Sequence, residues 1–263
     1  MPNAQLALIA LAGFAAGAVN ALAGGGTLIS FPVLVAAGLP AIAANVTSTI
    51  ALCPGYLGAA LAQRADLHGQ RARLYRVLPV AMAGGLLGAA LLLRTGAQKF
   101  AAAVPWLLLA GCALLAAQER LRATLTARFA RGAAGIAPAG ARSAPLWLPP
   151  LVAAGAVYGG YFGAGMSVIL LAVLGLALKD TLPRLNALKQ AVALATNCAA
   201  AIWLGMRAPV NWRVVAVLAV SALLGGAWGG RRARRLSPQW LRRIIVALGI
   251  ALAVVYLLRK RAF

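Results

Sequence analysis

Runs of apolar residues long enough to cross a lipid bilayer dominate this sequence. A transmembrane helix needs about 20 mostly apolar residues to span the hydrocarbon core. With their flanks, several runs reach this length, the clearest being residues 77–93, 100–117, 214–228 and 244–258. Hydrophobic residues make up 63% of the 263 residues, whereas soluble domains are about 45–50% apolar. We therefore predict an all-α, polytopic membrane protein whose main surroundings are the lipid bilayer.

The distribution of charge agrees with this class of protein. The formal net charge is +22, and the 25 Lys and Arg residues lie in or beside the gaps between apolar runs. The acidic residues are only three: Asp66, Glu119 and Asp180. Basic loops are what the positive-inside rule expects of a polytopic membrane protein. The cations line no single helix face and no aromatic stacking platform accompanies them, so we do not expect nucleic acid as a partner.

Cysteine spacing and catalytic motifs give little support for an enzyme. Cys53, Cys112 and Cys198 all lie inside apolar runs without CxxC or Cys/His spacing, so we expect no metal site and read them as packing residues. G-x-S-x-G, H-E-x-x-H and P-loop motifs are absent, and His68 is the single histidine. We expect no catalytic residues and no cofactor. The N-terminus lacks a basic n-region, so a cleaved signal peptide is not expected either.

The pattern of the first half of the chain starts again in the second half. Each half has an apolar helix, a glycine-rich interruption, a short apolar piece, a helix with polar residues and two plain spans. The shared features lie 137 to 142 residues apart, and the pairs are Gly13 and Gly17 with Gly155 and Gly159, Gly24 and Gly26 with Gly163 and Gly165, Gly38 with Gly175, and Asn45 with Asn186. Such an internal repeat organises the fold.

The repeat divides the chain into three parts. We assign residues 1–118 to a first transmembrane repeat, residues 119–148 to a cytoplasmic linker and residues 149–263 to a second transmembrane repeat. The linker contains the longest polar stretch and is rich in Arg, Ala and Gly. We expect such a composition to form a flexible connection.

Loop charges indicate that the two repeats have opposite orientations. Three stretches with four, five and six cations belong in the cytoplasm: residues 64–76, 119–142 and 231–243. Two links with two cations each then fall outside: residues 94–99 and 207–213. The polar span at 40–63 then runs inward and its counterpart at 185–204 runs outward. We predict two inverted repeats, each with a broken helical hairpin and three spanning helices, in a multi-pass protein of the bacterial inner membrane.

The two glycine-rich interruptions are candidate half-sites for an anion. They lie at matching positions, residues 24–27 and 163–167, and adjacent glycines are poor helix interiors. Transporters built from inverted repeats bind substrate near the midplane, where the ends of broken helices meet. N–H groups at a helix start suit an anion, and Thr27 and Ser167 add hydroxyl donors there. Alternatively, the glycines only allow tight helix packing, which suits isolated glycines better than a run of three.

Polar residues inside two matching spans form a second candidate constellation. Its members are Asn45, Thr47, Ser48 and Thr49 in the first repeat and Asn186, Lys189, Gln190, Thr196 and Asn197 in the second. Polar groups within hydrocarbon must find partners or line a cavity. Lys189 has two open interpretations: it snorkels to the membrane surface, or it faces the cavity and offers a full positive charge to an anion.

The acidic residues and the histidine all lie in loops, so the sequence shows no intramembrane proton relay. This pattern is compatible with anion efflux driven by the membrane potential. At roughly 100 mV, negative inside, each expelled charge gains about 2.3 kcal/mol.

At these positions the sequence resembles the TauE/SafE family of sulfite exporters, also called the TSUP family. The segments that carry the resemblance are residues 13–20, 24–29, 44–49, 186–189 and 210–212, together with Pro32, Pro54 and Gly55. The resemblance extends over nearly the whole chain. It implies outward movement of sulfite, of sulfonates such as sulfoacetate, or of related organic anions.

We therefore expect an inner-membrane exporter of small anions with a site in the middle of the membrane. The expected substrate-binding residues are Asn20, Gly24, Gly25, Gly26, Thr27, Asn45, Thr49, Gly163, Gly165, Ser167, Asn186 and Lys189. The alternative is a membrane enzyme or assembly factor that uses the same cavity, with Cys53 or Cys198 as a reactive thiol. The sequence leaves the oligomeric state open.

Overall fold

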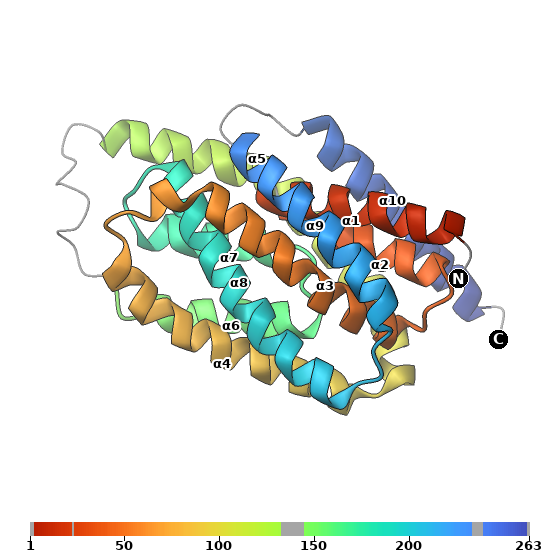
Figure 1. The fold of residues 1–263 in the computed structure, drawn as a ribbon. Helices are drawn as coiled ribbons and strands as arrows, with labels where there is room; N and C mark the ends of the chain where they lie inside the picture. Colours follow the sequence, from red (N-terminus) through yellow and green to blue (C-terminus); the bar gives the residue numbers. More distant parts are fainter. Residues whose placement is uncertain (1–2, 23, 133–144, 233–238, 262–263) are drawn as a thin grey trace.

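Helices make up the regular structure of the part of the chain that is described. The computed structural model describes residues 3–22, 24–132, 145–232 and 239–261. Its elements, shown in Figure 1, are α1 Asn3–Leu22, α2 Thr27–Ala36, α3 Ala41–Ala62, the short 3-10 helix η1 Arg64–Leu67, α4 Arg71–Thr95, α5 Ala97–Gly132, α6 Leu148–Tyr161, α7 Met166–Ala177, α8 Leu182–Arg207, α9 Trp212–Arg232 and α10 Gln239–Arg261. The predicted all-α fold is confirmed.

Five of the described helices, α1, α4, α5, α8 and α9, are long and apolar enough to cross a membrane. Large apolar side chains on their outer faces are exposed, among them Leu11, Leu87, Trp106, Val220 and Leu224. Many exposed large apolar side chains are unfavourable in water and fit a lipid environment. The structure therefore agrees with a multi-pass membrane protein.

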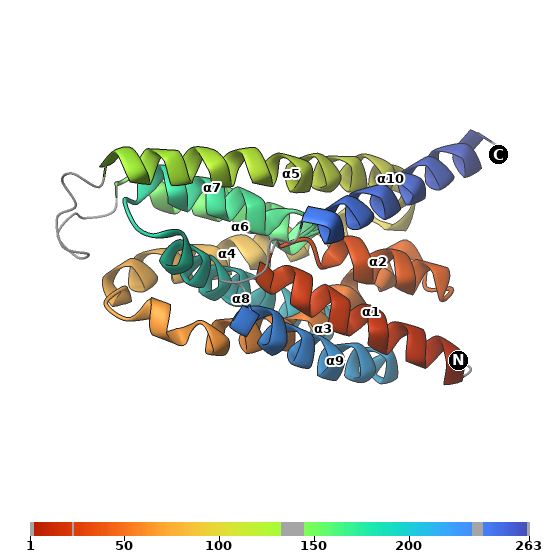
Figure 2. The same cartoon turned by 90° about the horizontal axis from the view of Figure 1, so that it is seen from above.

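Each repeat begins with a hairpin of two helices that enters the molecule and turns back near its middle. Figure 2 shows α1 running from the N-terminus to the centre, where α2 turns back toward the same end. The pair α6 and α7 does the same from the opposite end of the molecule. The two hairpins thus enter from opposite sides, as expected for inverted repeats.

Helix packing follows the same internal symmetry. In the first half α4 packs on α6 and α8 of the second half, and in the second half α9 packs on α1 and α3 of the first. The counterparts α3 and α8 pack on each other, as do α5 and α10. Exchanging the two repeats therefore reproduces the main contacts, and each repeat is completed by helices of the other.

Glycines make these close approaches between the repeats possible. A Cβ atom on Gly84 of α4 would lie 2.7 Å from the carbonyl oxygen of Ala153 in α6. A Cβ atom on Gly225 of α9 would overlap the carbonyl group of Phe14 in α1. Small residues let membrane helices approach closely in this way. Gly84 and Gly225 are equivalent in the two repeats.

The structure corrects part of the glycine pairing predicted from the sequence. Gly13 and Gly17 face α9, whereas Gly155 and Gly159 face α7 of their own hairpin. Their environments differ, so these two pairs are not equivalent positions. The pair Gly38 and Gly175 is not equivalent either: Gly38 follows the end of α2, while Gly175 lies within α7 against Leu125.

Two boundaries differ from the sequence prediction. Helix α5 continues to Gly132, so the first part of the predicted flexible linker is helical. The remainder of that linker, at residues 133–144, lies outside the described residues. Helix α4 begins at Arg71, so the basic loop predicted at 64–76 is shorter, and three of its arginines belong to the helix.

The loops gather at two ends of the molecule. Residues 63–70, between α3 and α4, contact the start of α8: the side-chain N–H of Gln70 donates to the carbonyl of Arg184 at 3.1 Å, and Arg184 donates to the carbonyl of His68 at 3.0 Å. We call this end the basic end. At the opposite end, Leu39 and Pro40 line one hollow together with Pro209 to Trp212.

Candidate functional site

The first helix break lies between α1 and α2 and depends on glycine. Gly24 has a φ of +81°, a region that L side chains rarely adopt. The side-chain oxygen of Asn20 accepts a hydrogen bond from the main-chain N–H of Gly26 at 2.7 Å. Asn20 thereby holds the start of α2 in place, and its side chain is buried.

The second break, between α6 and α7, has two glycines in the same backbone region. Gly163 and Gly165 have φ values of +80° and +82°. The hydroxyl of Tyr158 donates to the carbonyl of Ala164 at 2.6 Å, which fixes the loop from the last turn of α6. Helix α7 starts directly after this loop, at Met166.

The two breaks meet inside the molecule. A Cβ atom on Gly24 would collide with the side chain of Ser167 at the start of α7. A Cβ atom on Gly163 would lie 3.5 Å from the hydroxyl oxygen of Thr27 at the start of α2. The helix starts of α2 and α7 therefore lie against each other's breaks. Helix starts carry partial positive charge, so two of them converge here.

Gly25 and Gly165 are less tightly enclosed than Gly24 and Gly26. A Cβ atom on Gly25 would lie 3.0 Å from a methyl group of Leu115, and one on Gly165 would lie 3.1 Å from Leu114, both on α5. Helix α5 thus covers both breaks. A Cβ atom on Gly26 would meet the main chain of α1 and the side chain of Asn20.

The polar residues of α3 and α8 reach the ends of the broken helices in the other repeat. Asn45 of α3 donates its side-chain amide to the carbonyl of Tyr161, the last residue of α6, at 2.9 Å. Asn186 of α8 donates to the carbonyl of Ala21 near the end of α1 at 3.4 Å. The last carbonyls of a helix have no partner within it, and these amides supply one. Thr49 donates to the carbonyl of Asn45 within its own helix.

Two glutamines that the predicted set omits belong to the same cluster. Gln190, one turn after Asn186, donates to the carbonyls of Asn20 and Ala21 at 3.0 and 3.1 Å. Gln63, which follows the end of α3, accepts from the side-chain amide of Asn186 at 2.7 Å. The polar pattern of the second repeat already pointed to Gln190. Gln63 had no comparable signal because it borders a basic loop.

Lys189 is buried in the interior and does not snorkel to the surface. Its side chain is 1% exposed, and its Nζ has no hydrogen-bond partner among the described residues. The guanidinium of Arg122 on α5 is near enough to repel a charge on Lys189. A buried cation without a counter-ion is costly. A negatively charged group placed near Lys189 would offset this cost.

Other buried side-chain groups of the described structure also lack hydrogen-bond partners. The Nδ2 of Asn20 and the Nε2 of Gln63 have no acceptor within the described structure. Three buried acceptors in the described structure also lack a donor, namely the side-chain oxygens of Asn45, Asn186 and Gln190. An anion accompanied by water or carrying a protonated oxygen would satisfy both kinds of group. An unmet buried donor or acceptor costs about 1–3 kcal/mol.

Comparison with protein families matches this chain over residues 9–256 to the family model described as "Sulfite exporter TauE/SafE". The match covers nearly the whole chain, including both breaks and both polar spans. The chain belongs to this family. It is accordingly a membrane transporter of the sulfite exporter type. Neither the search of curated proteins nor the search of solved structures found a match.

The segments that carried the resemblance to the TauE/SafE family are not all at the breaks. Asn211 accepts from the main-chain N–H of Val214 at 3.3 Å and so caps the start of α9. Together with Trp212 it lines the hollow at the end opposite the basic end, and Thr47 of α3 also lines that hollow. Thr47 is buried, so the hollow extends from the surface toward the polar span.

The thiols are free in this TauE/SafE-family chain. Cys53 on α3 and Cys198 on α8 lie next to each other, and the thiol of Cys53 also faces the carbonyl of Thr49 at 3.4 Å. Cys112 lies apart from them and faces the carbonyl of Val246 on α10. The adjacent pair thus lies between the two polar spans.

Proposed function

We propose that this chain exports a small sulfur-containing or carboxylate anion, with sulfite and sulfonates as the leading substrates. The observation that carries the proposal is Lys189, a buried cation without a counter-ion or hydrogen-bond partner in the described interior. Membership of the TauE/SafE family supports the transport class.

The proposed binding region lies between the two hairpins. The starts of α2 at Thr27 and of α7 at Met166 offer N–H groups, Lys189 offers charge, and Asn20 and Gln63 offer amide donors. Such groups recognise the oxygens of a sulfite, sulfonate or carboxylate group, since charged hydrogen bonds are the strongest kind. No side chain here selects one of these anions over another.

Inverted hairpins supply a route to alternating access. Because each repeat is completed by helices of the other, rocking one against the other exposes the central region to either side in turn. We place the basic end in the cytoplasm of a bacterial cell, following the positive-inside rule. A membrane potential negative inside then drives the anion outward.

Flux through purified protein tests the proposal. Proteoliposomes should release radiolabelled sulfite or sulfoacetate when a potential of the correct sign is imposed, and empty liposomes should not. Lys189→Gln should reduce this flux at least about ten-fold, since a lost charged interaction of 1.4 kcal/mol or more is a factor of ten. Lys179→Gln, a matched change at an exposed lysine, should keep it. Normal flux in Lys189→Gln would overturn the assigned site.

A second candidate function is a membrane enzyme or assembly factor that uses a thiol. The adjacency of Cys53 and Cys198 is the observation that favours it. Replacing both by Ala distinguishes the two functions. An exporter keeps its anion flux in this variant, whereas a thiol-dependent protein loses its activity.

A further inference from the structure

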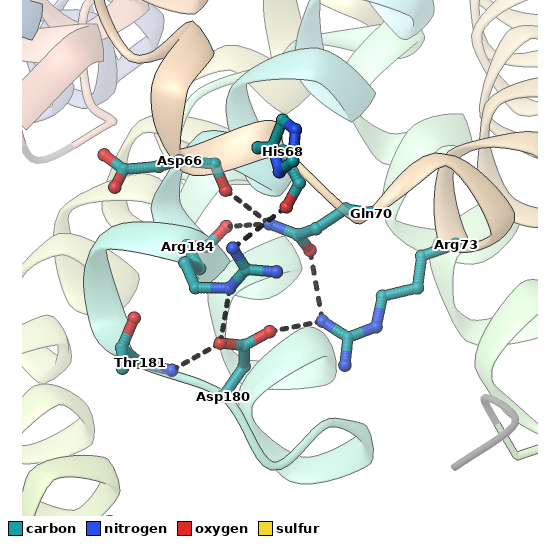
Figure 3. Close-up of polar contacts among 7 residues, drawn as sticks. All are labelled: Asp66, His68, Gln70, Arg73, Asp180, Thr181 and Arg184. Atoms are coloured by element: carbon teal, nitrogen blue, oxygen red, sulfur yellow. Dashed lines mark hydrogen bonds and ion pairs between the residues drawn. The ribbon is translucent and has the colours of Figure 1, made fainter. Parts of the chain in front are cut away.

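A cluster of charged and polar side chains joins the two repeats at the basic end (Figure 3). The carboxylate of Asp180, just before α8, pairs with Arg73 of α4 and with Arg184 of α8. The N–H of Thr181 also donates to Asp180 at 2.8 Å. Two cations from different repeats and one main-chain donor therefore converge on one carboxylate.

Asp180 is well enclosed although it lies near the surface. Its side chain is 3% exposed, compared with 15% for Arg73 and 22% for Arg184. Gln70 fills the space beside it by donating to the carbonyls of Asp66 and Arg184 and accepting from Arg73. The arginines are thus held in position from several directions, independently of Asp180.

Polar groups continue from this cluster toward the interior. Arg184 and Asn186 lie on the same helix, and Asn186 contacts Gln63 at 2.7 Å. Gln63 is buried, and its Nε2 has no acceptor among the residues described. On the outer side, Arg64, His68 and Arg71 line a surface hollow next to the cluster. Donors therefore occur in the surface hollow, in the arginine pair and, at Gln63, beside the proposed binding region.

We propose that Arg73, Arg184 and the N–H of Thr181 form a loading site for the transported anion, and that Asp180 occupies it as an internal plug. This rests on the proposed export function. Asp180 is one of three acidic residues in a chain with 25 Lys and Arg residues. Its carboxylate presents anionic oxygens to the arginines, as a carboxylate or sulfonate substrate would. When Asp180 leaves, the two repeats lose a link and the arginines become available to an incoming anion.

The test measures how fast small thiol reagents reach a cysteine placed behind the plug. Gln63→Cys is introduced after Cys53, Cys112 and Cys198 are replaced by Ala. Inside-out vesicles are treated either with the anionic sulfonatoethyl methanethiosulfonate or with its cationic trimethylammonioethyl analogue. The anionic reagent carries the sulfonate group of the proposed substrates, so it serves as the probe.

Asp180→Asn keeps the shape of the plug and removes its charge. We expect the anionic reagent to react roughly ten-fold faster in this variant, because an unopposed arginine pair concentrates anions, while the cationic reagent gains little. Equal acceleration of both reagents would show a gate without an anion site and would overturn the proposal. No acceleration of either would overturn it as well.

Arg73→Gln provides a second variant with the opposite expectation, in case Asp180→Asn does not reach the membrane. It weakens the link between the repeats but leaves Asp180 charged, so the cationic reagent should gain more than the anionic one. A gain for the anionic reagent alone would contradict the assignment. Labelling needs no transported substrate, so it tests the loading site separately from export. A protein without sulfite flux can still show the expected labelling, and a protein that exports sulfite can fail to show it.

Discussion

Asn45 and Asn186 occupy equivalent positions in the two repeats, and each donates its side-chain amide to a carbonyl at the end of the other repeat's first helix. The acceptors are Tyr161 at 2.9 Å and Ala21 at 3.4 Å. Each broken hairpin is therefore anchored by the polar span of its partner. We therefore expect a movement of either span to shift the opposite hairpin, beside the proposed anion site.

Replacing either asparagine by Leu should lower anion flux while the protein still reaches the membrane. Leucine is well tolerated in a membrane helix, but the acceptor carbonyl loses its donor at a cost of about 1–3 kcal/mol. Asn197→Leu is the matched control, because Asn197 is buried on the same helix as Asn186 and donates only to the carbonyl of Ala193 in that helix. Wild-type flux in both Asn45→Leu and Asn186→Leu would assign these residues to packing alone.

The sequence predicted the breaks and the polar spans because their signals are local. Adjacent glycines at residues 24–26 and an asparagine inside an apolar run stand out without knowledge of any neighbour. The interruptions predicted at residues 24–27 and 163–167 agree with α2 beginning at Thr27 and α7 at Met166.

What the sequence did not predict depends on contacts between the repeats. Gln63 looks like an ordinary residue at a helix end until α8 brings Asn186 to it. Likewise, Gly84 and Gly225 are small residues in apolar runs, and only the crossing of α4 with α6 and of α9 with α1 gives them a role. The ion pair of Arg73 with Asp180 joins residues of different repeats, which no local pattern reveals.

Gly24→Ala should be more harmful than Gly25→Ala. Gly24 has a φ of +81° and faces Ser167, so alanine there meets both backbone strain of about 1–2 kcal/mol and a collision. Gly25 faces only the end of the Leu115 side chain, which can move. Anion flux at equal membrane abundance should therefore fall at least about ten-fold in Gly24→Ala and change little in Gly25→Ala. The reverse order would contradict the described geometry of the break.

Cysteine labelling should place the loops on the predicted sides of the membrane. Ala65 lies at the basic end, Gln98 lies in the first turn of α5 and Pro209 lies in the link between α8 and α9, and all three residues are exposed. Single cysteines at Gln98 and Pro209 should react with an impermeant reagent in intact cells, and one at Ala65 only in inside-out vesicles. Labelling of Gln98 and Pro209 from opposite sides would be incompatible with inverted repeats. The sequence also predicts Ala137 of the linker to be cytoplasmic, and this residue lies outside the described residues.

Lys189→Met should make the protein more stable and less active. Methionine has a similar length and fills the same space, but it removes a buried charge that lacks a hydrogen-bond partner. We expect a gain of roughly 1–3 kcal/mol in the free energy of unfolding, which corresponds to a rise in Tm of about 2–4 °C per kcal/mol for a chain of this size. Thermal unfolding in detergent measures the gain, and the proteoliposome assay measures the loss of flux. Sulfite or sulfoacetate should raise the Tm of the wild-type protein and leave that of Lys189→Met unchanged, because the anion stabilises the folded protein through this charge. A lower Tm in Lys189→Met, with unchanged flux, would show that Lys189 stabilises the fold and does not bind the anion.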